Sequence, residues 1–172
     1  MTTLRAALIG APNSGKSSLF NTLTGSHQKV ANYPGVTVER RSGIVTTEAG
    51  HNIKLIDLPG LYSLNDRSLD ETVSREVITG AHDSEQQPEV LICVVNASNL
   101  RVHLRLVLEL RNLGLPMIIA LNMHDLATRD GIEIDVKRLS EELGLRVITT
   151  IAVRHSGINA LKELLDRDRS SY

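Results

Sequence analysis

The stretch from Gly10 to Ser17, GAPNSGKS, constrains the fold of this chain more than any other part of the sequence. It follows the pattern G-x-x-x-x-G-K-[ST], a glycine-rich loop that connects a strand to a helix. The flanking sequence fits this strand-to-helix connection, because an apolar run from Leu4 to Ile9 precedes the loop and a helical pattern from Ser17 to Leu23 follows it. The motif therefore predicts a strand–loop–helix unit.

The residue types in this loop indicate phosphate binding. Glycines let backbone N–H groups turn towards a β-phosphate, and the positive end of the following helix points at the same anion. We expect Lys16 to bridge the β- and γ-phosphates and the Ser17 hydroxyl to ligate Mg²⁺. The alternative is a chance match in an ordinary strand–turn–helix. The expected contact residues are Gly10, Ala11, Pro12, Asn13, Ser14, Gly15, Lys16, Ser17 and Ser18.

Length and composition limit the classes of protein to which the chain can belong. Its 172 residues suit one domain, 1–172. A net charge of −1 offers no basic surface for nucleic acid or an anionic membrane. The single cysteine, Cys93, lies in an apolar run and excludes an internal disulfide. No apolar stretch is long enough to cross a bilayer, so we expect a domain that is soluble on its own without membrane insertion.

Strand and helix patterns alternate along the chain, which predicts an α/β fold with three layers. We expect about six strands in a mostly parallel sheet with one antiparallel edge strand, and helices on both faces. Residues 26–36 are predicted to be a loop, because Asn32, Pro34 and Gly35 interrupt regular structure. Strands are predicted at 4–9, 38–47, 53–57, 90–95, 116–121 and 147–151, and helices at 16–23, 68–80, 100–113, 135–143 and 157–165.

The sequence Asp57-Leu58-Pro59-Gly60 follows a buried strand, so its carboxylate is expected beside the phosphate loop. Asp57 would hold Mg²⁺ through water, and the Gly60 N–H would reach the γ-phosphate. The alternative is a simple turn at the end of a strand. Residues 57–70 would then form the second mobile loop, switch II.

A first mobile loop, switch I, is expected at about 26–38. A hydroxyl at Thr37 can close on Mg²⁺ and the γ-phosphate when a triphosphate is bound and be released after hydrolysis. Threonine is common in loops, so the prediction depends on the position of Thr37 between Ser17 and Asp57. The nucleotide-contact residues expected here are Gly35, Val36, Thr37, Val38 and Glu39.

The loop Asn122-Met123-His124-Asp125 follows another predicted strand and indicates guanine recognition. The Asp125 carboxylate can accept hydrogen bonds from the ring N–H and the exocyclic amine of guanine, which adenine does not offer in that arrangement. Asn122 would tie this loop to the phosphate loop. Together with the motifs above, it predicts a GTP-binding domain with the fold of a Ras-like P-loop GTPase.

Several stretches closely resemble the N-terminal G domain of FeoB-type ferrous iron transporters, which are similar to TrmE-Era-like potassium-activated GTPases. The resemblance continues through residues 131–136 and so covers nearly the whole chain. The stretches are GAPNSGKSSLFN (10–21), VANYPGVTVE (30–39), DLPGLYSL (57–64) and LNMHD (121–125).

The resemblance implies a GTPase domain that regulates or powers ferrous iron uptake. It would lie at the cytoplasmic face of the bacterial inner membrane, joined to a helical regulatory segment and a membrane permease that are absent from this chain. It also implies guanine nucleotide, these further domains and small accessory transport proteins as partners.

Three positions depart from the family pattern. Ala11 replaces a common asparagine, Tyr33 replaces a common tryptophan, and the loop 150–153 has T-I-A instead of T-S-A. The T-I-A sequence can still offer a backbone N–H to the guanine carbonyl but lacks a serine to brace Asp125. The base-contact residues implied for this loop are Ile151, Ala152 and Val153.

Leu61 stands where Ras-like enzymes carry the glutamine that orients the attacking water. Backbone groups near Thr37 and Gly60 must then hold the water. The resemblance implies a K⁺ ion held by the Asn13 side chain, phosphate oxygens and carbonyls near Ala31 and Tyr33, although Asn13 could instead make only a local turn bond. The expected catalytic residues are Asn13, Lys16, Thr37 and Gly60.

No other side chains are expected to take part in the chemistry. Arg40 and Arg41 lie in a predicted strand and are interpreted as solvated surface charge, and Arg67 is only a remote candidate for an arginine finger. The six histidines show no spacing with carboxylates or Cys93 that would form an iron site.

Two other functions remain open from the sequence. One is the G domain of a ribosome-assembly or tRNA-modifying GTPase, against which the near-neutral charge argues. The other is a nucleotide-sensing switch with incidental turnover, in which Tyr33 and Tyr62 of the presumed mobile loops would contact a partner.

Overall fold

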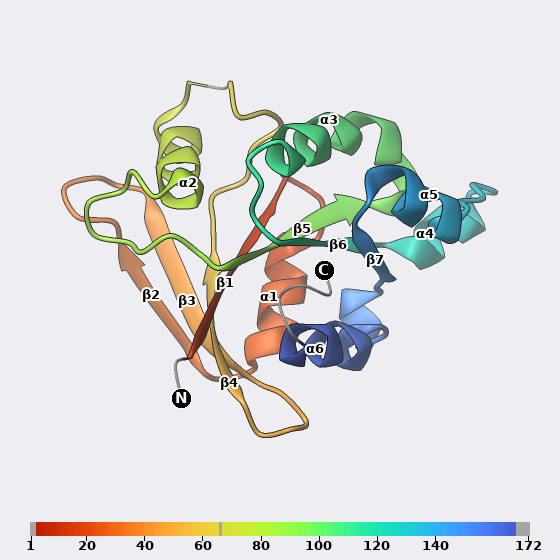
Figure 1. Cartoon of the computed structure of the whole chain (residues 1–172), viewed down its shortest axis with the longest axis horizontal. Helices are drawn as coiled ribbons and strands as arrows, with labels where there is room; N and C mark the ends of the chain where they lie inside the picture. Colours follow the sequence, from red (N-terminus) through yellow and green to blue (C-terminus); the bar gives the residue numbers. More distant parts are fainter. Residues whose placement is uncertain (1–2, 66, 168–172) are drawn as a thin grey trace.

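A computed structural model describes residues 3–65 and 67–167 of the chain (Figure 1). One seven-stranded sheet has the order β2-β3-β4-β1-β5-β6-β7, so the strand that leads into the glycine-rich loop is central. The strands are β1 Leu4–Gly10, β2 Gln28–Asn32, β3 Glu39–Thr46, β4 Asn52–Asp57, β5 Val90–Asn96, β6 Met117–Asn122 and β7 Arg146–Thr149. The helices are α1 Lys16–Thr24, α2 Leu69–Thr79, α3 Leu100–Arg111, α4 His124–Arg129, α5 Val136–Leu143 and α6 Ile158–Asp166.

The sheet is mostly parallel, as predicted. β1 pairs in parallel with β4 and β5, and β6 does so with β5 and β7. The antiparallel pairs among the described strands are β2 with β3 and β3 with β4, at one edge of the sheet. The count of about six strands was too low, because β2 lies within the predicted loop. The side chains of β2 are mostly exposed on both faces, Val30 by 58%, so its sequence carries no alternating apolar pattern.

Helices cover both faces of the sheet (Figure 1), which confirms the three-layer prediction. α1 and α6 pack on one face through residues such as Phe20 and Leu161, while α2, α3 and α5 pack on the other. The strand β5, next to the central β1, is buried on both sides, and its residues alternate between the two apolar clusters. Cys93 belongs to this strand, and burial raises the pKa of its thiol to about 12.

The other differences from the predicted elements are short helical turns and shifts of one or two residues at element ends, such as β7 ending at Thr149. α4 begins at His124, inside the segment predicted as a loop, and single 3₁₀ turns occur at Ala97–Asn99 and Ala152–Arg154. Elements this short have too few residues to show a helical period. In the part of the chain that the structure describes, no helix combines the length and apolar character that a membrane crossing requires.

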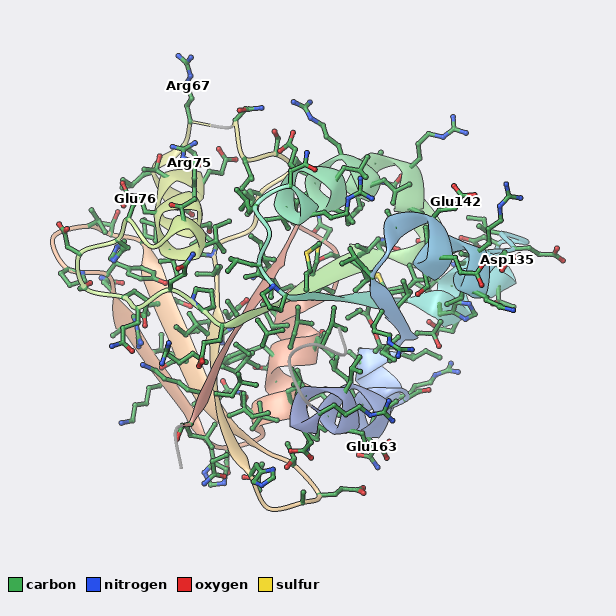
Figure 2. All side chains as sticks on the ribbon, in the orientation of Figure 1. Arg67, Arg75, Glu76, Asp135, Glu142 and Glu163 are labelled. Carbon is green, nitrogen blue, oxygen red and sulfur yellow. The ribbon has the colours of Figure 1, made fainter. Side chains whose placement is uncertain are left out.

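The loop that follows β4 is held against α3 by Glu109. The Ser63 hydroxyl donates to both carboxylate oxygens of Glu109 at 2.9 Å, and the Leu64 N–H donates at 2.7 Å. Arg75 of α2, labelled in Figure 2, donates to the Leu64 carbonyl at 2.9 Å. Partial burial raises the pKa of Glu109, but the bonds from Leu64 and Ser63 and the charge of Arg105 outweigh it and hold the pKa below its ordinary value. The middle of this loop is therefore bonded to both α3 and α2.

Candidate functional site

The loop between β1 and α1 lies at the carboxyl edge of the sheet, where the parallel strands end. The Gly15 backbone has a left-handed conformation, with φ of 85°, immediately before α1 begins. A Cβ atom at Gly15 would overlap the Asn122 amide, and one at Gly10 would lie 2.6 Å from the Val94 carbonyl oxygen. Glycine is therefore required at both positions. Asn13, at the exposed tip, is also left-handed, with φ of 63°, which asparagine tolerates better than most residues.

Asn122, at the end of β6, joins this loop to two others. Its Nδ2 donates to the Ser14 carbonyl at 3.2 Å. Its Oδ1 accepts from the Thr150 hydroxyl at 3.0 Å and from the Ala152 N–H at 3.1 Å. Asn122 is 2% exposed, so water does not compete for these bonds. The expected tie to the phosphate loop is present, but the Ala152 N–H that was expected to face a guanine carbonyl is already engaged by Asn122.

A cavity of about 150 Å³ lies beside Asn122. Met123 is left-handed, with φ of 59°, and turns the chain so that α4 starts at the next residue with Asp125 in its first turn. His124 was expected to contact the base, but it is not among the residues lining this cavity. The lining residues are Gly15, Ser18, Asn122, Met123, Asp125, Leu126, Ile151, Ala152 and Val153.

A second cavity, of about 190 Å³, lies on the other side of the α1 start. Here Lys16 and Asp57 form a direct ion pair, with side chains 11% and 5% exposed. Ser17 lines the same cavity, so the structure brings together the hydroxyl and the carboxylate that were expected to hold Mg²⁺. The lining residues are Lys16, Ser17, Val38, Glu39, Arg41, Asp57, Leu58, Pro59 and Asp70.

The chain after Asp57 continues along β1 towards the glycine-rich loop. The Leu61 N–H donates to the Gly10 carbonyl at 3.1 Å. A Cβ at Gly60 would lie 3.2 Å from Pro12, so the backbone of Gly60 packs directly on the phosphate loop. The Leu61 side chain is fully buried, and neither Gly60 nor Leu61 lines either cavity described above. Residue 66 of the expected switch II stretch lies outside the described residues.

Of the loop expected to be switch I, only its last residue, Val38, lines the second cavity, together with the neighbouring Glu39. The Tyr33 N–H donates to the Val38 carbonyl at 2.9 Å, which closes residues 33–38 into a turn. Thr37 is exposed in this turn, and neither it nor Gly35 or Val36 lines either cavity described above. The expected grouping of Thr37 with Ser17 and Asp57 is therefore not present in this conformation.

Under the alternative hypothesis of a nucleotide-sensing switch, Tyr33 would contact a partner, but its side chain is only 1% exposed. Its ring packs edge-on against His82, with centroids 5.2 Å apart, in the apolar cluster that includes Leu61 and Val77. Burial, together with the nearby charge of Glu85, raises the pKa of Tyr33 to about 12. Tyr62, by contrast, is 46% exposed and so, among the described aromatic residues, is the one available for a partner.

The surroundings of two arginines, Arg40 and Arg41, also differ from the predicted solvated surface. Arg40 pairs with Glu85, which is 7% exposed, and Arg41 lines the second cavity, so neither is simply solvated. Arg67 extends away from the domain (Figure 2) and does not approach the cavity. Asp70, at the start of α2, also lines the cavity without having been expected there. Arg41 and Asp70 were missed because neither belongs to a motif.

Comparison with known proteins fits this geometry. A sequence profile of the family described as ferrous iron transport protein B matches residues 4–165. The chain belongs to this family. The Fe(2+) transporter FeoB of Escherichia coli (strain K12) is 46% identical over 175 residues, which are 99% of this chain and 22% of that protein. The chain thus spans only a small part of the length of its curated FeoB relatives.

Solved FeoB structures share the fold. A GDP-bound mutant of the S. thermophilus FeoB G-domain has a TM-score of 0.88 at 39% identity, covering 99% of this chain and 63% of that one. The cytosolic domain of the T. maritima FeoB iron transporter in GMPPNP form has a TM-score of 0.87 at 38% identity. The match covers 96% of this chain and 65% of that one. These likenesses confirm the predicted P-loop GTPase fold.

We expect Asn122→Ala to destabilise the domain by about 2–4 kcal/mol, because it leaves the Ser14 carbonyl and the Ala152 N–H buried without partners. Urea unfolding followed by circular dichroism measures this. Asn112→Ala, at an exposed position after α3, is the matched control. A loss of stability no larger than that of the control would contradict a structural role for Asn122.

Proposed function

We propose that the domain binds GTP and hydrolyses it to GDP and phosphate. The arrangement that supports this most is the pair of cavities on either side of the α1 start, one with Asp125 and the other with Lys16, Ser17 and Asp57. The buried Asn122 fixes their relative position. The FeoB relatives from S. thermophilus and T. maritima are described with GDP and GMPPNP, which fits such a site.

Ser17 and Asp57 provide the hard oxygen ligands that Mg²⁺ prefers, and both face the second cavity, so the residues present fit that ion. When bound, Mg²⁺ neutralises charge on the phosphates. Lys16 would exchange the Asp57 carboxylate for phosphate oxygens as nucleotide enters, which frees Asp57 to face the metal. Thr37 would join this site only after the 33–38 turn opens.

Hydrolysis would depend on backbone groups. Since the Leu61 side chain is buried, it cannot orient water, and we assign that task to the backbone around Gly60 and Thr37. Charge between the β- and γ-phosphates would be neutralised by K⁺ at Asn13, whose exposed, left-handed position at the loop tip leaves its side-chain oxygen free to turn towards the phosphates.

Guanine selectivity would come from Asp125, since a base without matching donors leaves this carboxylate unpaired. We expect Asp125→Ala to lower the affinity for GDP by about 100-fold or more, because charge-assisted bonds to the base are lost. Titration with a fluorescent GDP analogue measures this, and ATP should not compete in the wild-type protein. Asp130→Ala, at the exposed end of α4, is the control and should bind normally. Retention of GDP affinity in Asp125→Ala would refute this assignment.

We expect single-turnover GTP hydrolysis to be faster in KCl than in NaCl at equal ionic strength, because K⁺ supplies the missing positive charge. Without K⁺ the rate should be of the order of 10⁻⁴ s⁻¹, as for an unassisted Ras-like enzyme. Asn13→Ala should remove the difference between the two salts. Equal wild-type rates in the two salts, or K⁺ stimulation that survives in Asn13→Ala, would overturn the potassium role.

We further propose that the domain serves ferrous iron uptake as part of a longer protein at the cytoplasmic face of a bacterial inner membrane. Its 46% identity to E. coli FeoB, over 22% of that transporter, supports this. In the full-length protein, Lys16→Ala should reduce cellular uptake of ferrous iron to background, because phosphate binding is lost. Lys29→Ala, on the exposed strand β2, should preserve uptake. Normal uptake by the Lys16→Ala protein would contradict this role.

A further inference from the structure

Arg41 occupies a position in the second cavity that the function proposed so far does not use. It lies on β3 directly opposite Asp57 of β4, since the two residues are paired in the antiparallel register. Residues opposite each other on neighbouring strands project from the same face of a sheet. Arg41 accordingly lines the cavity together with Lys16, Ser17 and Asp57.

The charge of Arg41 is less well satisfied than that of its neighbour. The Arg41 Nε atom is buried and makes no hydrogen bond within the described residues. It forms an ion pair with Glu39 Oε1 at 3.4 Å, in which the Arg41 side chain is 29% exposed and the Glu39 side chain 59% exposed. By contrast, Arg40 is held by the buried Glu85 and by the Ser42 hydroxyl at 3.0 Å. A buried guanidinium N–H without an acceptor is unfavourable, which points to an anion that is bound in the working protein.

The charges around the cavity indicate which anion this is. Lys16, the other cation that lines it, is already paired with Asp57, and two further carboxylates, Glu39 and Asp70, line the cavity as well. A nucleoside triphosphate brings one more phosphate group than a diphosphate to this side of the loop. Guanidinium groups are well suited to phosphate, because their donors match its oxygens.

We propose that Arg41 is a phosphate-binding cation that favours nucleoside triphosphate over diphosphate in this site. The inference deepens the proposed GTPase function and rests on it. Arg41 supplies a fixed positive charge from the strand itself, so it acts without the movement that Thr37 requires. Its packing over the Phe20 ring, 5.8 Å from the centroid, holds the guanidinium in place at the cavity wall.

The test compares the affinities for fluorescent GMPPNP and GDP analogues in Mg²⁺ at fixed ionic strength. Arg41→Met keeps the length of the side chain but removes its charge, and it should weaken GMPPNP analogue binding by about tenfold, the loss expected for one charge-assisted hydrogen bond. GDP analogue binding should change by no more than about twofold, which also shows that the variant is folded. Arg41→Lys should retain most of the preference for triphosphate.

Lys29→Met is the matched control, because Lys29 is an exposed cation on the paired strand β2 and does not line the cavity. It should leave the ratio of the two affinities unchanged. The proposal is overturned if Arg41→Met leaves the ratio of the two affinities unchanged. It is also overturned if Arg41→Lys lowers the GMPPNP analogue affinity as much as Arg41→Met does, or if Lys29→Met lowers it equally. Failure of the wild-type protein to bind the GDP analogue would instead refute the underlying GTPase function.

Discussion

The geometry of the site depends on one buried carboxamide. Asn122 uses both ends of its amide to hold three chain segments that are far apart in sequence: the glycine-rich loop, the end of β6 and the loop after β7. Because the atoms are shielded from water, each bond is both strong and costly to leave unmade. Gly15 permits this contact, since any side chain there would occupy the space of the amide. The relative placement of the two cavities follows from this close approach.

The second cavity, which contains Lys16 and Asp57, is organised by charged groups. Lys16 and Asp57 satisfy each other at the carboxyl edge of the sheet, and both are nearly buried. An isolated charge at either position would be unfavourable, so the pair keeps the cavity intact until another set of charges replaces it. Arg41 and Asp70 add one positive and one negative group at the rim of the same space. Glu39 also lines the cavity, so its lining holds two cations and three carboxylates.

The fold and most of the site could be predicted because the relevant residues sit at strand ends within local motifs. The glycine-rich loop, Asp57 and the Asn122–Asp125 loop each follow a strongly apolar strand, and parallel strands bring their carboxyl ends together. What escaped prediction depends on tertiary context. β2 has no apolar alternation because its side chains are mostly exposed, and the place of Arg41 follows from the register between β3 and β4.

The burial of Tyr33 has a consequence for how the loops around the site can move. Its ring shares an apolar cluster with Leu61 and with Val77 of α2, so the 33–38 turn and the chain after β4 shield each other from solvent. When Thr37 moves to the cavity, the Tyr33 ring either stays buried while the rest of the turn moves or becomes exposed to solvent. Exposing it would cost about 1.5–3 kcal/mol of hydrophobic free energy. If the ring is exposed, part of this shared cluster is lost, so the movement of one loop changes the burial of the other. Part of the binding energy at the phosphates is therefore determined by repacking well away from them.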